Sequence, residues 1–106
     1  MALTRSFKET VRARAQRDPA FRDALLQEAI EQFINGDVDS GLNILGNYVN
    51  ATIGYPMLGK LTGKNPKSLH RMLGPNGNPK SDNIFNIIHQ LKQQEGLQFD
   101  IRLRRA

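Results

Sequence analysis

The sequence predicts an all-α protein of five to six helices followed by one short β-strand. Through most of the chain, apolar residues recur every three or four positions, which is the period of an amphipathic helix. Glycine and proline separate these segments, and several segments begin at a residue that can cap a helix. At the C-terminal end the period changes to two, which is typical of a half-buried strand.

The bulk composition favours one small intracellular domain. A chain of 106 residues with 39% hydrophobic residues can build a modest core. The absence of cysteine excludes disulfides and thiol chemistry and suits a reducing compartment. Basic residues interrupt the N-terminal segment, so it does not resemble a signal peptide, and no stretch is apolar for long enough to span a bilayer. We therefore expect a soluble, cytoplasmic protein that does not enter a membrane.

The first two predicted helices differ in their apolar faces. Residues 3–17 place an apolar residue at every fourth position among arginines, which predicts a basic helical arm. We expect this arm, residues 1–17, to precede a main domain of residues 18–106. Asp18 and the proline after it form a cap and a first helical turn, and the broad apolar face that follows ends at Asn35 and the next glycine.

Capping residues and glycines delimit the other helices. Asp37 and Ser81 can each cap a helix, whereas Gly54 and Gly96 each end one. The segment 74–79 contains two prolines and an Asn-Gly pair, which predict a loop of fixed shape. The remaining helices are expected at residues 37–53, 56–62, 66–73 and 81–95.

The alternation at residues 97–103 predicts a strand that needs a partner. Nothing else in the sequence has the pattern of a strand. One interpretation pairs this strand with the same strand of a second subunit, which would give a homodimer. The other interpretation lays the segment on its own domain as a tail.

Charge is distributed unevenly along the chain, although the net value is only +5. The 42 residues from Ser40 to Ser81 contain five basic residues and no acidic one, whereas residues 18–39 contain six acidic residues and one basic one. An acid-free stretch of this length is a candidate surface for a polyanion. The alternative is a solvated basic face without a partner.

Residues 56–73 have the pattern of two short helices that cross closely. Such a crossing needs a small residue in the first helix, a glycine in the turn and an apolar inner face on the second helix. Gly59 and Gly63 supply the two small residues, and a mid-helix glycine otherwise costs about 1 kcal/mol relative to alanine. Leu69, Met72 and Leu73 form the inner face. This pattern predicts a helix-turn-helix, and an ordinary helical hairpin is the alternative.

The second of these helices has a clear start, because Asn65 can cap it and Pro66 fits its first position. The side chains expected to face outward, where a recognition helix reads the major groove, are Lys67, Ser68, His70 and Arg71. Lys67 and Arg71 can pair with guanine O6 and N7, whereas Ser68 and Asn65 suit a phosphate or mixed contact. The expected flanking phosphate contacts are Lys60, Lys64, Lys80 and the Asn76-Gly77-Asn78 turn.

A resemblance to a known family adds to this interpretation. Within residues 54–91, the stretches 58–63 (LGKLTG), 67–73 (KSLHRML) and 77–79 (GNP) resemble the addiction-module antidote (antitoxin) proteins of the lambda-repressor/Cro-like helix-turn-helix class. The likeness extends over about residues 21–99. It implies a lambda-repressor-like domain and an operator-binding dimer. It also implies that the protein represses its own operon and neutralises a partner toxin.

The sequence offers little for catalysis. The two histidines, His70 and His89, have no cysteine or suitably spaced carboxylate beside them for a metal site. No nucleophile elbow or phosphate-binding loop is present. We therefore expect no enzyme activity, no catalytic residue, no metal and no cofactor.

A protein-binding module that neutralises a partner toxin without binding DNA is the main alternative function. The acidic residues 18–39 could hold a basic toxin, or they could form a solvated helix face. The arginines of the first helix are equally open to two interpretations, because they could reach phosphates beside an operator or serve only solubility.

Overall fold

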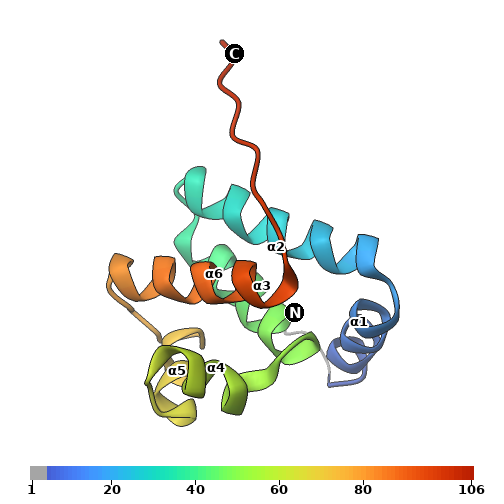
Figure 1. Cartoon of the computed structure of the whole chain (residues 1–106), viewed down its shortest axis with the longest axis vertical. Helices are drawn as coiled ribbons and strands as arrows, with labels where there is room; N and C mark the ends of the chain where they lie inside the picture. The colour runs from blue at the N-terminus through green and yellow to red at the C-terminus, as the bar shows by residue number, and fades with distance from the viewer. Residues whose placement is uncertain (1–4) are drawn as a thin grey trace.

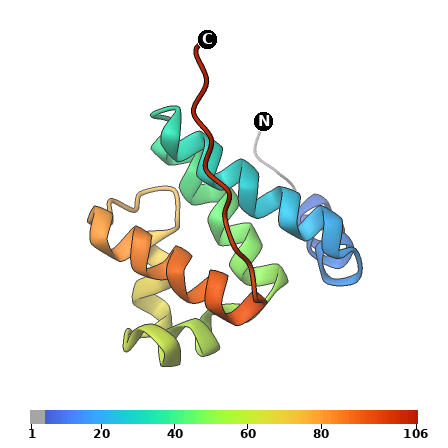
Figure 2. The same ribbon diagram turned by 45° about the horizontal axis from the view of Figure 1, so that its top comes forward.

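The computed structural model describes residues 5–106, and these residues form an all-α protein (Figures 1 and 2). Its helices are α1 (Arg5–Arg17), α2 (Pro19–Ile34), α3 (Val38–Ala51), α4 (Gly54–Thr62), α5 (Pro66–Met72) and α6 (Ser81–Glu95). The all-α prediction is confirmed. The expected start of the first helix at Leu3 lies outside the described residues. Within them, no helix is both long enough and apolar enough to cross a bilayer.

Carboxylates cap α2 and α3 as the sequence predicts. The Asp18 side chain accepts a hydrogen bond from the Phe21 amide at 3.2 Å. The Asp37 side chain accepts one from the Ser40 amide, also at 3.2 Å. At the other end of the chain, Gly96 follows α6 with a φ of 65°, a left-handed conformation that favours glycine. Local capping chemistry therefore sets these helix ends.

Two helix starts differ from the prediction. α4 begins at Gly54 rather than at Pro56, because a proline fits anywhere in a first turn, where its missing N–H would have no helical partner. α6 begins at Ser81, so Lys80 is the N-cap residue and no side chain caps the helix. Asp82 instead places a carboxylate in the first turn, near the positive end of the helix dipole.

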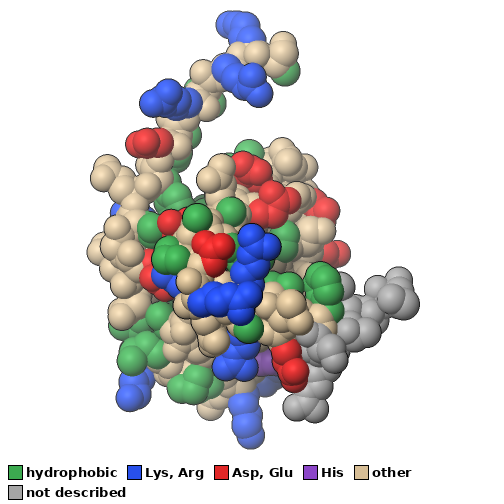
Figure 3. Space-filling model, turned by 90° about the vertical axis from the view of Figure 1, so that its right-hand side faces the viewer, with side chains coloured by type: hydrophobic (Ala, Val, Ile, Leu, Met, Phe, Trp, Pro, Cys, Tyr) green, Lys and Arg blue, Asp and Glu red, His purple; other side chains and the backbone are tan. Residues whose placement is uncertain are grey.

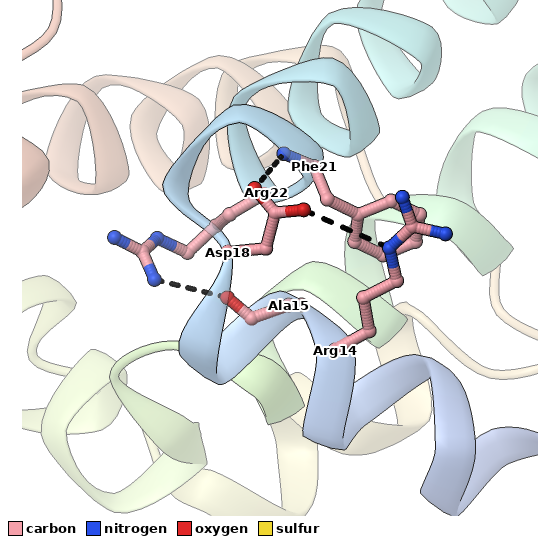
Figure 4. Close-up of polar contacts among 5 residues, drawn as sticks. All are labelled: Arg14, Ala15, Asp18, Phe21 and Arg22. Carbon is pink, nitrogen blue, oxygen red and sulfur yellow. Dashed lines mark hydrogen bonds and ion pairs between the residues drawn. The ribbon is translucent and has the colours of Figure 1, made fainter.

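The corner between α1 and α2 is held by two arginines (Figure 4). The Arg14 guanidinium lies 4.6 Å from the centre of the Phe21 ring, and its Nε is 3.7 Å from the Asp18 carboxylate. Arg22 Nη1 donates a hydrogen bond to the Ala15 carbonyl at 2.9 Å. These arginines therefore contribute to the packing of α1 on α2.

The core forms around α3, whose buried side includes the fully buried Tyr48. α1 and α2 pack on α3, α3 packs on α4, and α4 also contacts α5 and α6. This order leaves α5 at the periphery of the molecule. The buried residues that form the common core are Leu26, Ala29, Leu42, Leu45, Tyr48, Val49, Leu58, Leu69, Leu73, Ile87 and Leu91.

The strand expected at residues 97–103 does not form in the single chain. Leu97 packs against the core, but the residues after it have no regular secondary structure and project past the helices (Figures 1 and 2). A strand requires a hydrogen-bonded neighbour, and no other strand exists among residues 5–106. The period-two pattern of residues 97–103 was therefore not sufficient to predict a strand.

Candidate nucleic-acid interface

The crossing of α4 and α5 depends on two glycines. A Cβ atom at Gly59 would lie 2.7 Å from the Lys64 carbonyl oxygen and 3.2 Å from Pro66 Cγ. The Lys64 amide donates to the Gly59 carbonyl at 3.1 Å, which closes the turn. Gly63 has a φ of 70° at the C-cap of α4. The predicted roles of both glycines are therefore confirmed.

The predicted start and inner face of α5 are also found, whereas the helix ends at Met72, one residue before the expected end. The Asn65 side chain accepts a hydrogen bond from the Lys67 amide at 2.8 Å, and Pro66 is the first helical residue. Leu69 is fully buried, and Leu73 is buried at the C-cap. Met72 packs against the same core from a half-buried position. These contacts fix which side of α5 faces solvent.

The solvent side of α5 carries the predicted basic side chains. Lys67, His70 and Arg71 are exposed, and Ser68 is half-buried. Within residues 5–106, neither Lys67 nor Arg71 forms an ion pair with a carboxylate. Because α5 packs chiefly on α4, no other helix covers this side. The cationic side of α5 is therefore accessible to a ligand.

His70 has a neighbour that the sequence did not indicate. Its ring lies against the Tyr55 ring of α4, with centroids 4.9 Å apart and planes inclined by 50°. Burial raises the pKa of Tyr55 to about 12, so its hydroxyl is protonated at neutral pH. This contact restricts the orientation of the imidazole while leaving it exposed.

The loop after α5 is held close to the end of that helix. The Gly74 amide donates to the Arg71 carbonyl at 3.1 Å, and the Gly77 amide donates to the Gly74 carbonyl at 3.0 Å. The backbone at Gly77 lies so close to the Met72 carbonyl that a Cβ atom there would overlap it. Glycine at position 77 therefore allows the loop to lie beside α5.

A groove of about 570 Å³ lies between this loop, α5 and the start of α6. The polar residues that line it include Ser68, Arg71, Asn76, Asn78, Lys80, Asp82 and Asn83. The structure thus brings together five of the predicted site residues around one groove. The other five predicted site residues do not line it: Lys60 and Lys64 lie at the end of α4 and in the turn, and Asn65, Lys67 and His70 lie outside the groove at the cap and on the exposed side of α5.

Two of these groove residues, Asp82 and Asn83, were not predicted. Asp82 is the first acidic residue after the acid-free stretch, and this position was the only signal for it in the sequence. A carboxylate in a basic groove repels phosphate but can accept a hydrogen bond from cytosine N4. The amide of Asn83 can read adenine. The groove therefore contains hydrogen-bonding groups of both kinds, acceptors on Asp82 and amide groups on Asn83, beside its basic residues.

The described residues contain no arrangement typical of a metal centre. No group of three or more histidine, cysteine, aspartate or glutamate side chains among residues 5–106 could hold a metal ion. No family model, no curated protein and no solved structure matches this chain.

Proposed function

We propose that the chain is a sequence-specific, double-stranded-DNA-binding transcriptional regulator with a lambda-repressor-like helix-turn-helix, formed by α4 and α5. In this proposal α5 lies in the major groove as the recognition helix. The observation that carries it is the exposed basic side of α5, which has no carboxylate partner and no helix over it within residues 5–106. The resemblance of residues 54–91 to the antidote family supports the same conclusion.

The proposed contacts divide into two kinds. Lys67 and Arg71 read guanine edges from α5, while His70 and Ser68 contact the groove or nearby phosphates. The side-chain oxygen Oδ1 of Asn65 accepts the capping hydrogen bond, so this residue contacts a phosphate through the N–H groups of its side-chain Nδ2. The remaining proposed phosphate contacts are Lys60, Lys64, Asn76, Asn78 and Lys80.

Salt dependence tests whether the surface binds a polyanion. Retention of the protein on a random duplex should fall steeply as salt is added, because each phosphate that a lysine or arginine neutralises releases condensed counterions. For about five such contacts, the slope of log K against log salt should be about −4.5. Retention that is insensitive to salt would favour the alternative function, a protein-binding module that neutralises a toxin without binding DNA.

Two substitutions separate the base-reading role from the phosphate-binding role. Arg71→Ala should cost about 1–3 kcal/mol on the specific operator and much less on a random duplex. Lys80→Ala should weaken binding to both duplexes alike and reduce the salt slope by about 1. The operator is first selected from a random pool, and affinities are measured by fluorescence anisotropy. Equal losses from both variants on both duplexes would contradict these roles.

The wider biological role rests on the resemblance. We propose that the protein forms a homodimer, represses its own operon in the cytoplasm and neutralises a partner toxin. A dimer suits paired half-sites about 34 Å apart on DNA. Expression of the neighbouring reading frame with and without this protein tests the antitoxin role: growth arrest that this protein relieves would support it, and normal growth in both cases would contradict it.

A further inference from the structure

The end of the chain exposes apolar side chains that nothing in the single molecule covers. We use the name tail for residues 99–105. Ile101 and Leu103 are 87% and 97% exposed, although Leu97 just before the tail packs against the core. The basic residues of the tail, all exposed, are Arg102, Arg104 and Arg105. The tail also contains one exposed acidic residue, Asp100, so its net charge is positive. An exposed segment that alternates apolar and charged side chains has the composition of an interaction surface.

The tail points away from the proposed DNA surface. α4 and α5 lie at one end of the molecule, and the tail leaves past α2 toward the other end (Figures 1 and 2). The tail arginines therefore do not extend the basic side of α5.

The junction between α2 and α3 has complementary chemistry. Ile34 is 79% exposed at the end of α2, and Val38 is 45% exposed at the start of α3. The exposed carboxylates near them are Glu28, Glu31, Asp37 and Asp39. Within residues 5–106, no lysine or arginine pairs with these carboxylates, whose hydrogen-bond donors are neutral groups. We call these six residues the acidic corner. Figure 3 views the molecule from the opposite side, where α1 and the start of α2 face the viewer and acidic and basic side chains lie close together.

We propose that the tail of one copy binds the acidic corner of a second copy. Ile101 and Leu103 cover Ile34 and Val38, while the tail arginines lie opposite the carboxylates of the corner. This inference rests on the homodimer of the proposed function and specifies which surfaces form it. It does not depend on DNA binding.

The geometry favours a dimer in which each copy places its tail on the acidic corner of the other copy. The ten residues from Leu97 to Ala106 span roughly 30 Å when extended, which is enough to reach a neighbouring molecule. In the single chain Ile101 and Leu103 remain almost fully exposed, so the tail does not cover its own corner. Reciprocal exchange closes a two-fold dimer.

Disulfide trapping tests which surfaces meet, and the absence of native cysteine makes it clean. Arg104→Cys is mixed with Asp39→Cys under mild oxidation, and each position is exposed in the single chain. The proposal expects the mixed disulfide dimer to form at least about tenfold faster than the Arg104→Cys homodimer. Mixing Arg104→Cys with Ala13→Cys, on the exposed side of α1, gives the matched background rate. Faster formation of the Arg104→Cys homodimer would overturn the proposal in favour of paired tails.

Charge exchange tests the same contact without cysteine. Changing the three tail arginines to glutamate should raise the dimer dissociation constant by at least about tenfold in sedimentation. Changing Glu28, Glu31 and Asp39 to lysine in the same chain should restore the original value. Restoration would support the proposal, and a failure to restore would overturn it. A wild-type protein that is monomeric at micromolar concentration would overturn both this inference and the proposed dimer, while salt-dependent DNA retention would still test DNA binding separately.

Discussion

Gly59→Ala is expected to destabilise the protein, although the same change in an unobstructed helix is stabilising. The new Cβ would lie 2.7 Å from the Lys64 carbonyl oxygen, closer than real Cβ contacts come. That oxygen belongs to the backbone of the turn, and the new Cβ would also lie 3.2 Å from Pro66 Cγ. The clash can therefore be relieved only if the turn and the start of α5 move away from α4.

The magnitude follows from three terms. Alanine gains about 1 kcal/mol over glycine in a helix interior. Overpacking of a close contact costs about 1–3 kcal/mol. The hydrogen bond from the Lys64 amide to the Gly59 carbonyl, now 3.1 Å long, weakens as the turn moves, at a cost of about 0.5–1 kcal/mol. The net loss in the free energy of unfolding is about 0.5–3 kcal/mol, or roughly 2–24 °C in Tm for a domain of this size.

Thermal and urea unfolding followed by circular dichroism measure this loss. Asn43→Ala is the matched control, because Asn43 is exposed in the middle of α3 and alanine there gains about 0.5 kcal/mol in helix propensity without a clash. The two variants should therefore shift Tm in opposite directions. If Gly59→Ala raised Tm as the control does, the argument that a close crossing requires glycine would be refuted.

Two further predictions concern backbone strain and pH. Gly63→Ala should lower the free energy of unfolding by about 1 kcal/mol because its φ is 70°, although no atom lies within 4 Å of the new Cβ. Gly63→Asn should lose less in the same urea titration, and equal stability of the alanine variant and wild type would contradict the assigned strain. Stability should also fall as the pH rises from 10 toward 12. Burial raises the pKa of Tyr55 to about 12 and that of Tyr48 further, so the native state keeps protons that the unfolded chain loses above pH 10. Tyr55→Phe should reduce this slope in urea titrations across that range, and an unchanged slope would contradict the assignment.

The sequence predicted the helices and the crossing because the responsible signals are local. Asp18, Asp37 and Asn65 cap helices through amides only two or three residues away, so short patterns are sufficient to find them. Gly59 was also predictable, because a glycine in a helix interior carries a cost that only close packing offsets. The inner face of α5 followed from the helical period.

The features that the sequence did not predict depend on tertiary position. The contact between Tyr55 and His70 joins two helices, and no pattern in either helix indicates it. Asp82 lines the groove because the loop after α5 brings the start of α6 beside α5. The apolar period within each helix does not indicate this arrangement. The prediction of a strand at residues 97–103 was wrong for a related reason. Alternating apolar and polar residues indicate which face of a strand would be buried, but they do not supply the neighbouring strand that it needs.

The stability of the fold and the proposed affinity for DNA are linked through α5. A helix of seven residues is too short to be stable alone, since isolated helices below about 12 residues are marginal in water. Its order comes from the Asn65 cap, from the burial of Leu69 and Leu73, and from the loop that Gly77 lets lie against its end. A duplex would therefore meet a basic side that is already fixed, without the entropic cost of ordering it. It follows that a change in the α4–α5 crossing should weaken specific binding even where it touches no nucleotide, because it reduces the population in which α5 is correctly placed.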